Sequence, residues 1–127
     1  MLQPRALDHV GLIVTDMDRS LRFYQALGLE LLRRSERGTG SSAVLKVGAQ
    51  EINLFCRADL LPALLDDPQR IEHFCLMMES ATIEDLVAAL REAGLDIASG
   101  PRKRRDGAAV FLNDPNGVRV ELQIRGA

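Results

Sequence analysis

The sequence predicts an α+β protein in which one βαβββ module occurs twice. Three observations support this prediction. The two histidines, His9 and His73, each open an apolar run, each run leads into a segment of helical periodicity, and each helical segment ends at a glycine, Gly28 or Gly94. The histidines are 64 positions apart and the glycines 66, a drift that unequal loops produce. We therefore expect two modules with the same order of elements.

The first module is predicted to span about residues 5–56. Residues 7–14, LDHVGLIV, are short and rich in Val, Ile and Leu, which predicts a buried strand. A helix capped by Asp16 or Asp18 follows, and its inward stripe is Met17, Leu21, Tyr24 and Leu27. Strand periodicity returns in LELLRRSE, crosses the flexible RGTGSS and continues in AVLKVG and EINLFC.

The second module is predicted to span about residues 71–127, after a connector at 57–70 that contains two prolines, several acids and a leucine-rich stretch suited to a short helical turn. Its elements repeat the order of the first module. They are a strand at 71–78, a helix from about Thr82 to Ala93, and strands at about 95–99, 107–113 and 118–124. The segment NDPNG at 113–117 predicts the turn between the last two strands.

Composition excludes several classes of protein. A length of 127 residues with 46% hydrophobic residues and a net charge of -2 is typical of one globular domain. The sequence has no apolar run long enough to span a membrane and no leader pattern, so we expect a cytoplasmic protein without a membrane partner. Cys56 and Cys75 lack C-x-x-C spacing, which predicts buried, reduced thiols. The run RKRR at 102–105 is too short to indicate a nucleic-acid partner.

Alternation along the strands predicts which side chains share a face of the sheet. In the last strand Val118, Val120, Leu122 and Ile124 form an apolar face, which leaves Glu121 on the opposite face. The same alternation places His9 and His73 opposite the helices. Two histidines and one carboxylate from separate strands can bind Fe(II), Mn(II), Ni(II) or Zn(II) and leave coordination positions open for a substrate. The sequence therefore predicts one divalent metal ion held by His9, His73 and Glu121.

The segments LDHVGLIVTDMDRSLRFYQALGLEL and FLNDPNGVRVELQ resemble those of the vicinal oxygen chelate superfamily, and the resemblance covers nearly the whole chain. This superfamily includes glyoxalase I, extradiol dioxygenases, fosfomycin-modifying thiol transferases and bleomycin-resistance proteins. The resemblance implies a glyoxalase-like fold in which two βαβββ modules curve their mixed sheets into a cup, often completed across a homodimer. It also implies that His9, His73 and Glu121 are the metal ligands.

One position departs from the glyoxalase I pattern. Those enzymes usually carry a fourth ligand, a glutamate on the last strand of the first module, where this chain has Asn53. An amide oxygen is a weaker ligand than a carboxylate, so Asn53 is expected to orient a substrate or a bound water. Glu51 shares its face and is the alternative fourth ligand.

Further residues are expected to contact a small-molecule substrate. Phe55 shares a face with Asn53, Arg119 shares a face with Glu121, and both suit the wall of a mostly apolar pocket with a few polar groups. Arg102 begins the basic run, which either holds an anionic group of the substrate or forms a solvated loop.

Together these features predict a metal-dependent enzyme of the glyoxalase or dioxygenase type. The ion would act as a Lewis acid on two adjacent substrate oxygens, and Glu121 or Glu51 would move the proton. Lyase or isomerase, dioxygenase and thiol-transfer chemistry all suit this ligand set. The alternatives are a metal-free, ligand-sequestering protein of the bleomycin-resistance type and a metal-dependent sensor or storage protein. A homodimer is expected, and whether the metal ligands pair within one chain or across two stays open.

Overall fold

Two four-stranded mixed sheets, each with one helix, make up the computed structural model, which describes residues 3–60 and 71–126. The chain divides into two compact units, Met1–Pro68 and Gln69–Ala127. Each unit has the order βαβββ, and the predicted α+β fold class is confirmed. The leucine-rich part of the predicted connector, residues 61–70, lies outside the described residues.

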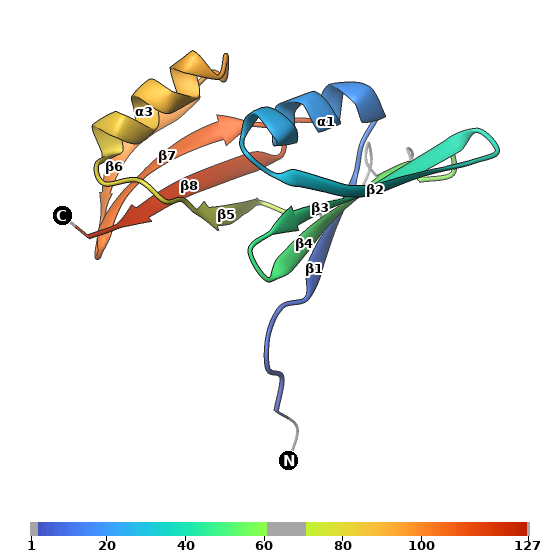
Figure 1. Ribbon diagram of the computed structural model, residues 1–127, viewed down its shortest axis with the longest axis horizontal. Helices are drawn as coiled ribbons and strands as arrows, with labels where there is room; N and C mark the ends of the chain where they lie inside the picture. The colour runs from blue at the N-terminus through green and yellow to red at the C-terminus, as the bar shows by residue number, and fades with distance from the viewer. Residues whose placement is uncertain (1–2, 61–70, 127) are drawn as a thin grey trace. The chain divides into compact units, whose positions relative to one another are not determined.

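The first unit contains α1 (Met17–Ala26) and the strands β1 (His9–Ile13), β2 (Glu30–Arg37), β3 (Gly40–Val47) and β4 (Gln50–Cys56). The strands are ordered β1-β4-β3-β2, with β1 parallel to β4 and the other neighbours antiparallel. Helix α1 lies against one face of this sheet (Figure 1). Of the two predicted caps, Asp16 is the N-cap and accepts a hydrogen bond from the Arg19 amide at 3.1 Å, while Gly28 ends the helix with φ of 106°.

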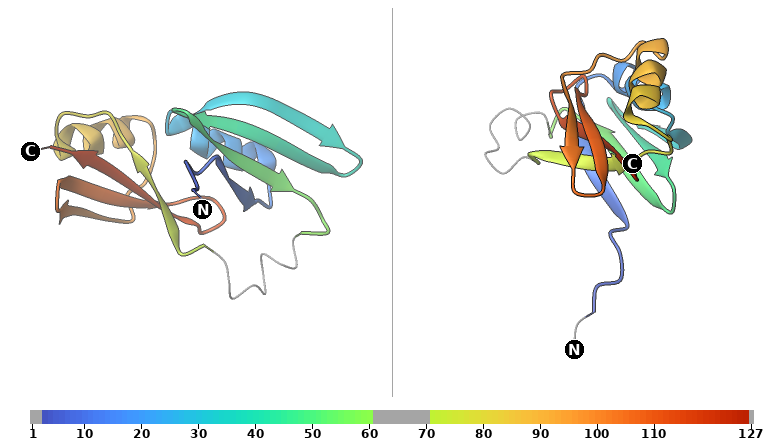
Figure 2. Two further views of the ribbon diagram at one scale, coloured as in Figure 1. Left: turned by 90° about the horizontal axis from the view of Figure 1, so that it is seen from below. Right: turned by 90° about the vertical axis from the view of Figure 1, so that its left-hand side faces the viewer.

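The second unit contains α3 (Ile83–Glu92) and the strands β5 (His73–Met77), β6 (Ser99–Arg104), β7 (Gly107–Asn113) and β8 (Arg119–Arg125). Its strand order, β5-β8-β7-β6, repeats that of the first unit, with the parallel pair again joining the first and last strands. Figure 2 shows α3 against one face of this sheet. Thr82 caps α3 by accepting a hydrogen bond from the Asp85 amide at 3.0 Å.

The duplication extends to the register of the parallel strand pairs. In each unit the histidine is the first residue of its strand and is paired with a charged residue of the neighbouring strand. The next pair of residues on the same face of the sheet lies two positions further along both strands. Asn53 and Glu121 consequently occupy equivalent places in the two units. The paired residues are His9 with Glu51 and Gly11 with Asn53 in the first unit, and His73 with Arg119 and Cys75 with Glu121 in the second.

Each sheet has a buried face against its helix and an opposite face that carries the polar side chains. The predicted alternation is confirmed on β8 and at the residue before it, because Val118, Val120, Leu122 and Ile124 are at most 6% exposed. We call the opposite face of the second sheet the second polar face; it carries His73, Cys75, Met77, Arg102, Arg104, Phe111, Arg119, Glu121 and Gln123. The first polar face carries His9, Gly11, Arg33, Ser35, Arg37, Ser42, Val44, Lys46, Glu51, Asn53 and Phe55.

Two local predictions are wrong. The strand expected at 95–99 lies at Ser99–Arg104, so Arg102, Lys103 and Arg104 of the basic run belong to β6, and Arg105 lies in the turn that follows. Its register shifts between Ser99 and Arg102, an irregularity that alternation alone does not show. Cys75 is exposed and Cys56 is partly exposed, although both are free thiols as expected. Cys75 is exposed because its strand turns the odd-numbered residues toward the second polar face.

Candidate metal centre

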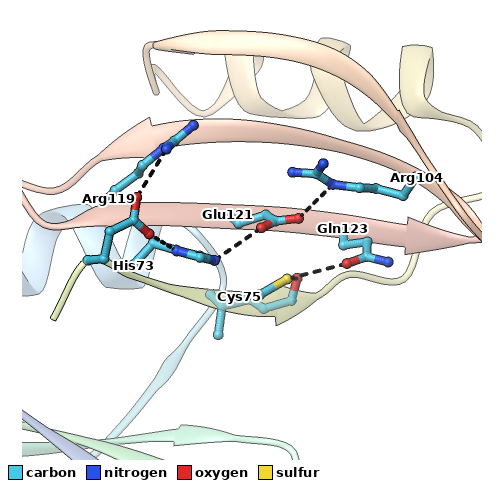
Figure 3. Close-up of polar contacts among 8 residues, drawn as sticks. His73, Cys75, Arg104, Arg119, Glu121 and Gln123 are labelled. Atoms are coloured by element: carbon cyan, nitrogen blue, oxygen red, sulfur yellow. Dashed lines mark hydrogen bonds and ion pairs between the residues drawn. The ribbon is translucent and has the colours of Figure 1, made fainter.

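His73 and Glu121 face each other across neighbouring strands of the second polar face (Figure 3). The distance from His73 Nε2 to Glu121 Oε1 is 3.4 Å, which is long for a hydrogen bond. Two atoms that bind one ion at about 2.1 Å are about 3.0 to 3.4 Å apart in octahedral or tetrahedral geometry. The donor types and their separation therefore fit two ligands of one divalent ion.

The other ring nitrogen of His73 is already occupied. His73 Nδ1 contacts the carboxylate of the preceding residue, Glu72, and this contact fixes the orientation of the ring. His9 shows the same arrangement in the first unit, with Nδ1 at 2.8 Å from the carboxylate of Asp8. A carboxylate on one ring nitrogen is the usual support for a histidine that binds a metal through the other. Both histidines thus present Nε2 as the remaining ligand atom.

Glu121 is buried, and a cation compensates its charge. Its side chain is only 9% exposed, and Arg104 Nε donates a hydrogen bond to Oε2 at 3.1 Å. This contact leaves Oε1 directed at His73 (Figure 3). Because burial disfavours an unpaired carboxylate, the contact with Arg104 compensates the buried Glu121 side chain and fixes its orientation.

Replacing Arg104 by Met is expected to lower the free energy of unfolding by about 1 to 2 kcal/mol, because the buried carboxylate of Glu121 loses its cation. Arg102→Met is the matched control: Arg102 lies on the same strand and over the same ring, but it is exposed and does not contact Glu121. We expect a change below about 0.5 kcal/mol for the control. Urea unfolding with a chelator present measures both, and equal changes in the two variants would contradict the assigned role.

Three guanidinium groups surround the buried ring of Phe111. The guanidinium carbon atoms (Cζ) of Arg119, Arg102 and Arg104 lie 4.1, 5.2 and 5.3 Å from the centroid of the Phe111 ring. Arg119 also contacts Glu72 at 3.3 Å. With two carboxylates against three guanidiniums, the second polar face has a surplus positive charge next to the His73 and Glu121 pair. Such a surface suits an anionic group of a ligand.

Cys75 lies beside Glu121 on the second polar face and contacts Gln123 Oε1 at 3.7 Å (Figure 3). Desolvation by the neighbouring groups raises the pKa of the Cys75 thiol above its usual value, and the negative charge of Glu121 raises it further. Both effects disfavour the thiolate, which is the form in which a cysteine binds metals.

The first polar face carries the remaining predicted residues. His9 and Glu51 are opposite each other on β1 and β4, and Asn53 and Phe55 follow along β4. Asn53 Oδ1 is buried, and no described residue donates a hydrogen bond to it. A buried acceptor without a donor is costly, so this atom is suited to accept a hydrogen bond from a bound molecule or a water.

The structure thus brings together two of the three predicted ligands, His73 and Glu121, in the second unit. His9 lies in the first unit, so the complete set stays a prediction. Across residues 3–60 and 71–126, three or more His, Cys, Asp or Glu side chains do not converge as a metal-binding group. Of the predicted substrate-binding residues, Arg119 and Arg102 lie beside this pair, and Asn53 and Phe55 lie on the first polar face.

Sequence reasoning missed the supporting residues of the site. Asp8 and Glu72 each precede a histidine, and this repeated acid-histidine pair was a signal available in the sequence. Arg104 and Phe111 had no comparable signal, because their contacts depend on the irregular register between β6 and β7.

These features define a protein of paired βαβββ units with a histidine-carboxylate pair on the open side of a sheet. The family model for the Glyoxalase/Bleomycin resistance protein/Dioxygenase superfamily matches residues 6–122. The chain belongs to this superfamily, and the predicted resemblance is confirmed.

Individual relatives agree with this assignment. The chain is similar to lactoylglutathione lyase of Haemophilus influenzae, with 30% identity over 90% of this chain and 88% of the relative. It is also 29% identical to the glyoxalase domain-containing protein RDO1 of Mycosarcoma maydis, over 95% of this chain and 69% of that protein. The crystal structure of a glyoxalase family protein from Enterococcus faecalis matches with a TM-score of 0.74 and 28% identity, over 94% of this chain and 97% of the other.

Among the described residues, neither helix has the length and apolar character needed to cross a membrane.

Proposed function

We propose that the protein is a divalent-metal-dependent enzyme of the glyoxalase or dioxygenase type that acts on a small, oxygen-chelating substrate. The observation that carries this proposal is the 3.4 Å separation of His73 Nε2 and Glu121 Oε1, with Nδ1 of the same ring held by Glu72. His9, supported by Asp8 in the same way, is the proposed third ligand. A bound Fe, Mn, Ni or Zn ion would supply Lewis-acid catalysis to two adjacent substrate oxygens.

The side chains around the pair have separable roles in this proposal. Glu72 holds the His73 ring, and Arg104 holds Oε2 of Glu121, so that both ligand atoms are oriented before a substrate binds. Arg119 and Arg102, stacked on Phe111, bind an anionic group of the substrate. These residues position the reaction and do not take part in bond changes.

Proton transfer in an isomerisation or lyase reaction is assigned to a carboxylate. Glu121 has one oxygen on Arg104 and one toward His73, which limits its freedom to exchange protons. Glu51 is partly exposed and pairs in register with His9, so it is the stronger candidate for the base. Asn53 Oδ1, which accepts no hydrogen bond from a described residue, is proposed to orient a substrate hydroxyl or a water.

A metal-free binding protein of the bleomycin-resistance type is the second candidate function. The pairing of Arg104 with Glu121 favours it, because this contact compensates the carboxylate without an ion. In that case the basic face around Phe111 would bind an anionic ligand that is sequestered and not converted.

Metal content separates the two functions. The protein is expressed without a histidine tag, purified, reconstituted with Fe(II), Mn(II), Ni(II) and Zn(II) in turn, and analysed for bound metal. The enzyme proposal expects about one ion per chain with at least one of these metals. If the protein stays empty after every reconstitution, the metal-dependent enzyme is excluded and the binding protein is retained.

We also propose a homodimer, on the basis of the family resemblance. The metal site would then form within each chain or between His9 of one chain and the partner subunit's His73. Metal binding that weakens as the dimer dissociates on dilution would support the shared site, whereas full affinity in a demonstrated monomer would contradict it.

A further inference from the structure

The second unit contains a cleft that is separate from the candidate metal centre. It has a volume of about 790 Å³ and is bounded by the first turn of α3, the hairpin between β6 and β7, and the end of β8 (Figure 1). His73 and Glu121 lie on the second polar face, whereas the floor of this cleft lies on the face of the same sheet that α3 covers.

A row of three residues across the sheet forms this floor. Lys103 on β6 is directly opposite Ala108 on β7, and Ala108 is directly opposite Ile124 on β8. Directly opposite residues of antiparallel strands project from the same face. Ile124 is only 2% exposed and belongs to the apolar face of β8. The row therefore places the Lys103 side chain at the edge of an apolar floor, on the helix side of the sheet.

The apolar surface continues from the floor to the helix. Ile83 is the first residue of α3, lines the cleft and is only partly buried. Ala108 is also partly buried, and its methyl group is the smallest side chain of the row, so the space above it stays open. A short aliphatic chain placed there would lose contact with water against Ile83, Ala108 and Ile124.

Cations outnumber carboxylates around the cleft. The residues that line it include the cations Lys103, Arg104, Arg105 and Arg125 and the acids Glu84 and Asp106. Arg104 donates to Glu121 on the opposite face of the sheet. Lys103 and Arg105 are exposed, and neither makes a hydrogen bond or ion pair with any described residue. Two cations without a partner among the described residues thus border one end of the apolar floor.

The acids restrict where a negative group can lie. Glu84 belongs to the first turn of α3 together with Asp85, and these two like charges disfavour an anion at the helix end of the cleft. Asp106 follows Arg105 at the tip of the hairpin and forms no ion pair with it. The side of the cleft formed by β6, beside Lys103, is therefore the place for a negative group.

We propose that this cleft binds a small organic anion with an aliphatic tail, with its charged group on Lys103 and Arg105 and its tail against Ile83, Ala108 and Ile124. The basic run then serves two sites, because Arg102 and Arg104 project from the second polar face and Lys103 from the other. The inference does not depend on the proposed function, since none of the residues that carry it is a proposed metal ligand or substrate-binding residue.

The test titrates the full-length, isotope-labelled protein with hexanoate and follows amide shifts by NMR, with a chelator present so that the metal site has no influence. Hexanoate is expected to shift the Ala108 and Ile124 amides and to saturate below about 10 mM. Acetate, which lacks the tail, should bind at least about tenfold more weakly, because it buries less apolar surface. The neutral 1-hexanol and the cationic hexylammonium should also bind more weakly than hexanoate.

The matched variants are Lys103→Gln and Lys46→Gln, which replace the two lysines of the chain. Both lysines are exposed strand residues, but Lys46 belongs to β3 in the first unit. Lys103→Gln is expected to weaken hexanoate binding by about fivefold or more, and Lys46→Gln by less than about twofold. The proposal is overturned if hexanoate does not saturate, if acetate, 1-hexanol or hexylammonium binds as tightly as hexanoate, or if the two variants lose the same affinity.

Discussion

His73→Ala is expected to lower the affinity of the protein for its preferred divalent ion by more than about 100-fold. The substitution removes the nitrogen that lies 3.4 Å from Glu121 Oε1 and leaves the carboxylate with Arg104 alone. Glu121→Gln should have an effect of the same order, since a neutral amide is a weaker ligand. Competition with a chromophoric chelator measures the affinity of both variants.

Met77→Ala is the control for these two substitutions. Met77 lies on β5 and on the second polar face with His73, is 47% exposed, and has no atom suited to a hard divalent ion. The affinity of the Met77→Ala variant for the divalent ion should match that of the parent protein. A His73→Ala protein that folds normally and binds the ion as tightly as the parent would refute the assignment.

His9→Ala locates the third ligand. If the affinity falls as far as in His73→Ala, residues of both units hold the ion. If it is unchanged while His73→Ala loses the ion, the site is confined to the second unit, and the predicted three-residue set is wrong.

Gly107→Ala is expected to lower the free energy of unfolding by about 3 kcal/mol or more. A Cβ at this position would be 1.9 Å from the carbonyl oxygen of Ile124 and 2.8 Å from its carbonyl carbon. Both contacts are with the backbone of β8, so no side-chain rotation relieves them. Because Gly107 pairs with Arg104, the displacement should also disturb the cation that holds Glu121.

Gly48→Ala separates this steric effect from the general cost of replacing a glycine. Gly48 has φ of 57°, and a Cβ there would meet nothing within 4 Å. The left-handed backbone alone should cost about 1 kcal/mol. Urea unfolding followed by circular dichroism compares the two variants, and equal losses would show that the contact with Ile124 is relieved by a small shift of the strands.

Much of the fold could be predicted because its signals are local. The apolar alternation of β8 and the inward stripe of α1 depend only on the periods of strand and helix, and both agree with the observed burial. Gly28 and Gly94 end their helices with φ of 106° and 77°, where residues with a Cβ are strained. The position of β6 could not be predicted, because its register shift depends on pairing with β7.

The candidate site likewise has features that local sequence signals predict and features that depend on long-range strand pairing. Alternation was sufficient to place His73 and Glu121 on one face of the second sheet, and Glu51 and Asn53 on one face of the first. It could not show that Arg104, and no other member of the basic run, reaches Glu121, because that contact follows from long-range strand pairing.

The residue types and their periodicity by themselves predicted a duplicated α+β chain. They also predicted that the ligand-type side chains lie on the sheet faces opposite the helices. Both the order of the elements and the face of each side chain depend on patterns within a few neighbouring positions. The folded chain was needed to show a carboxylate buried between a histidine and an arginine. Burial and charge balance are properties of side chains that are distant in the sequence, and only their packing brings them together.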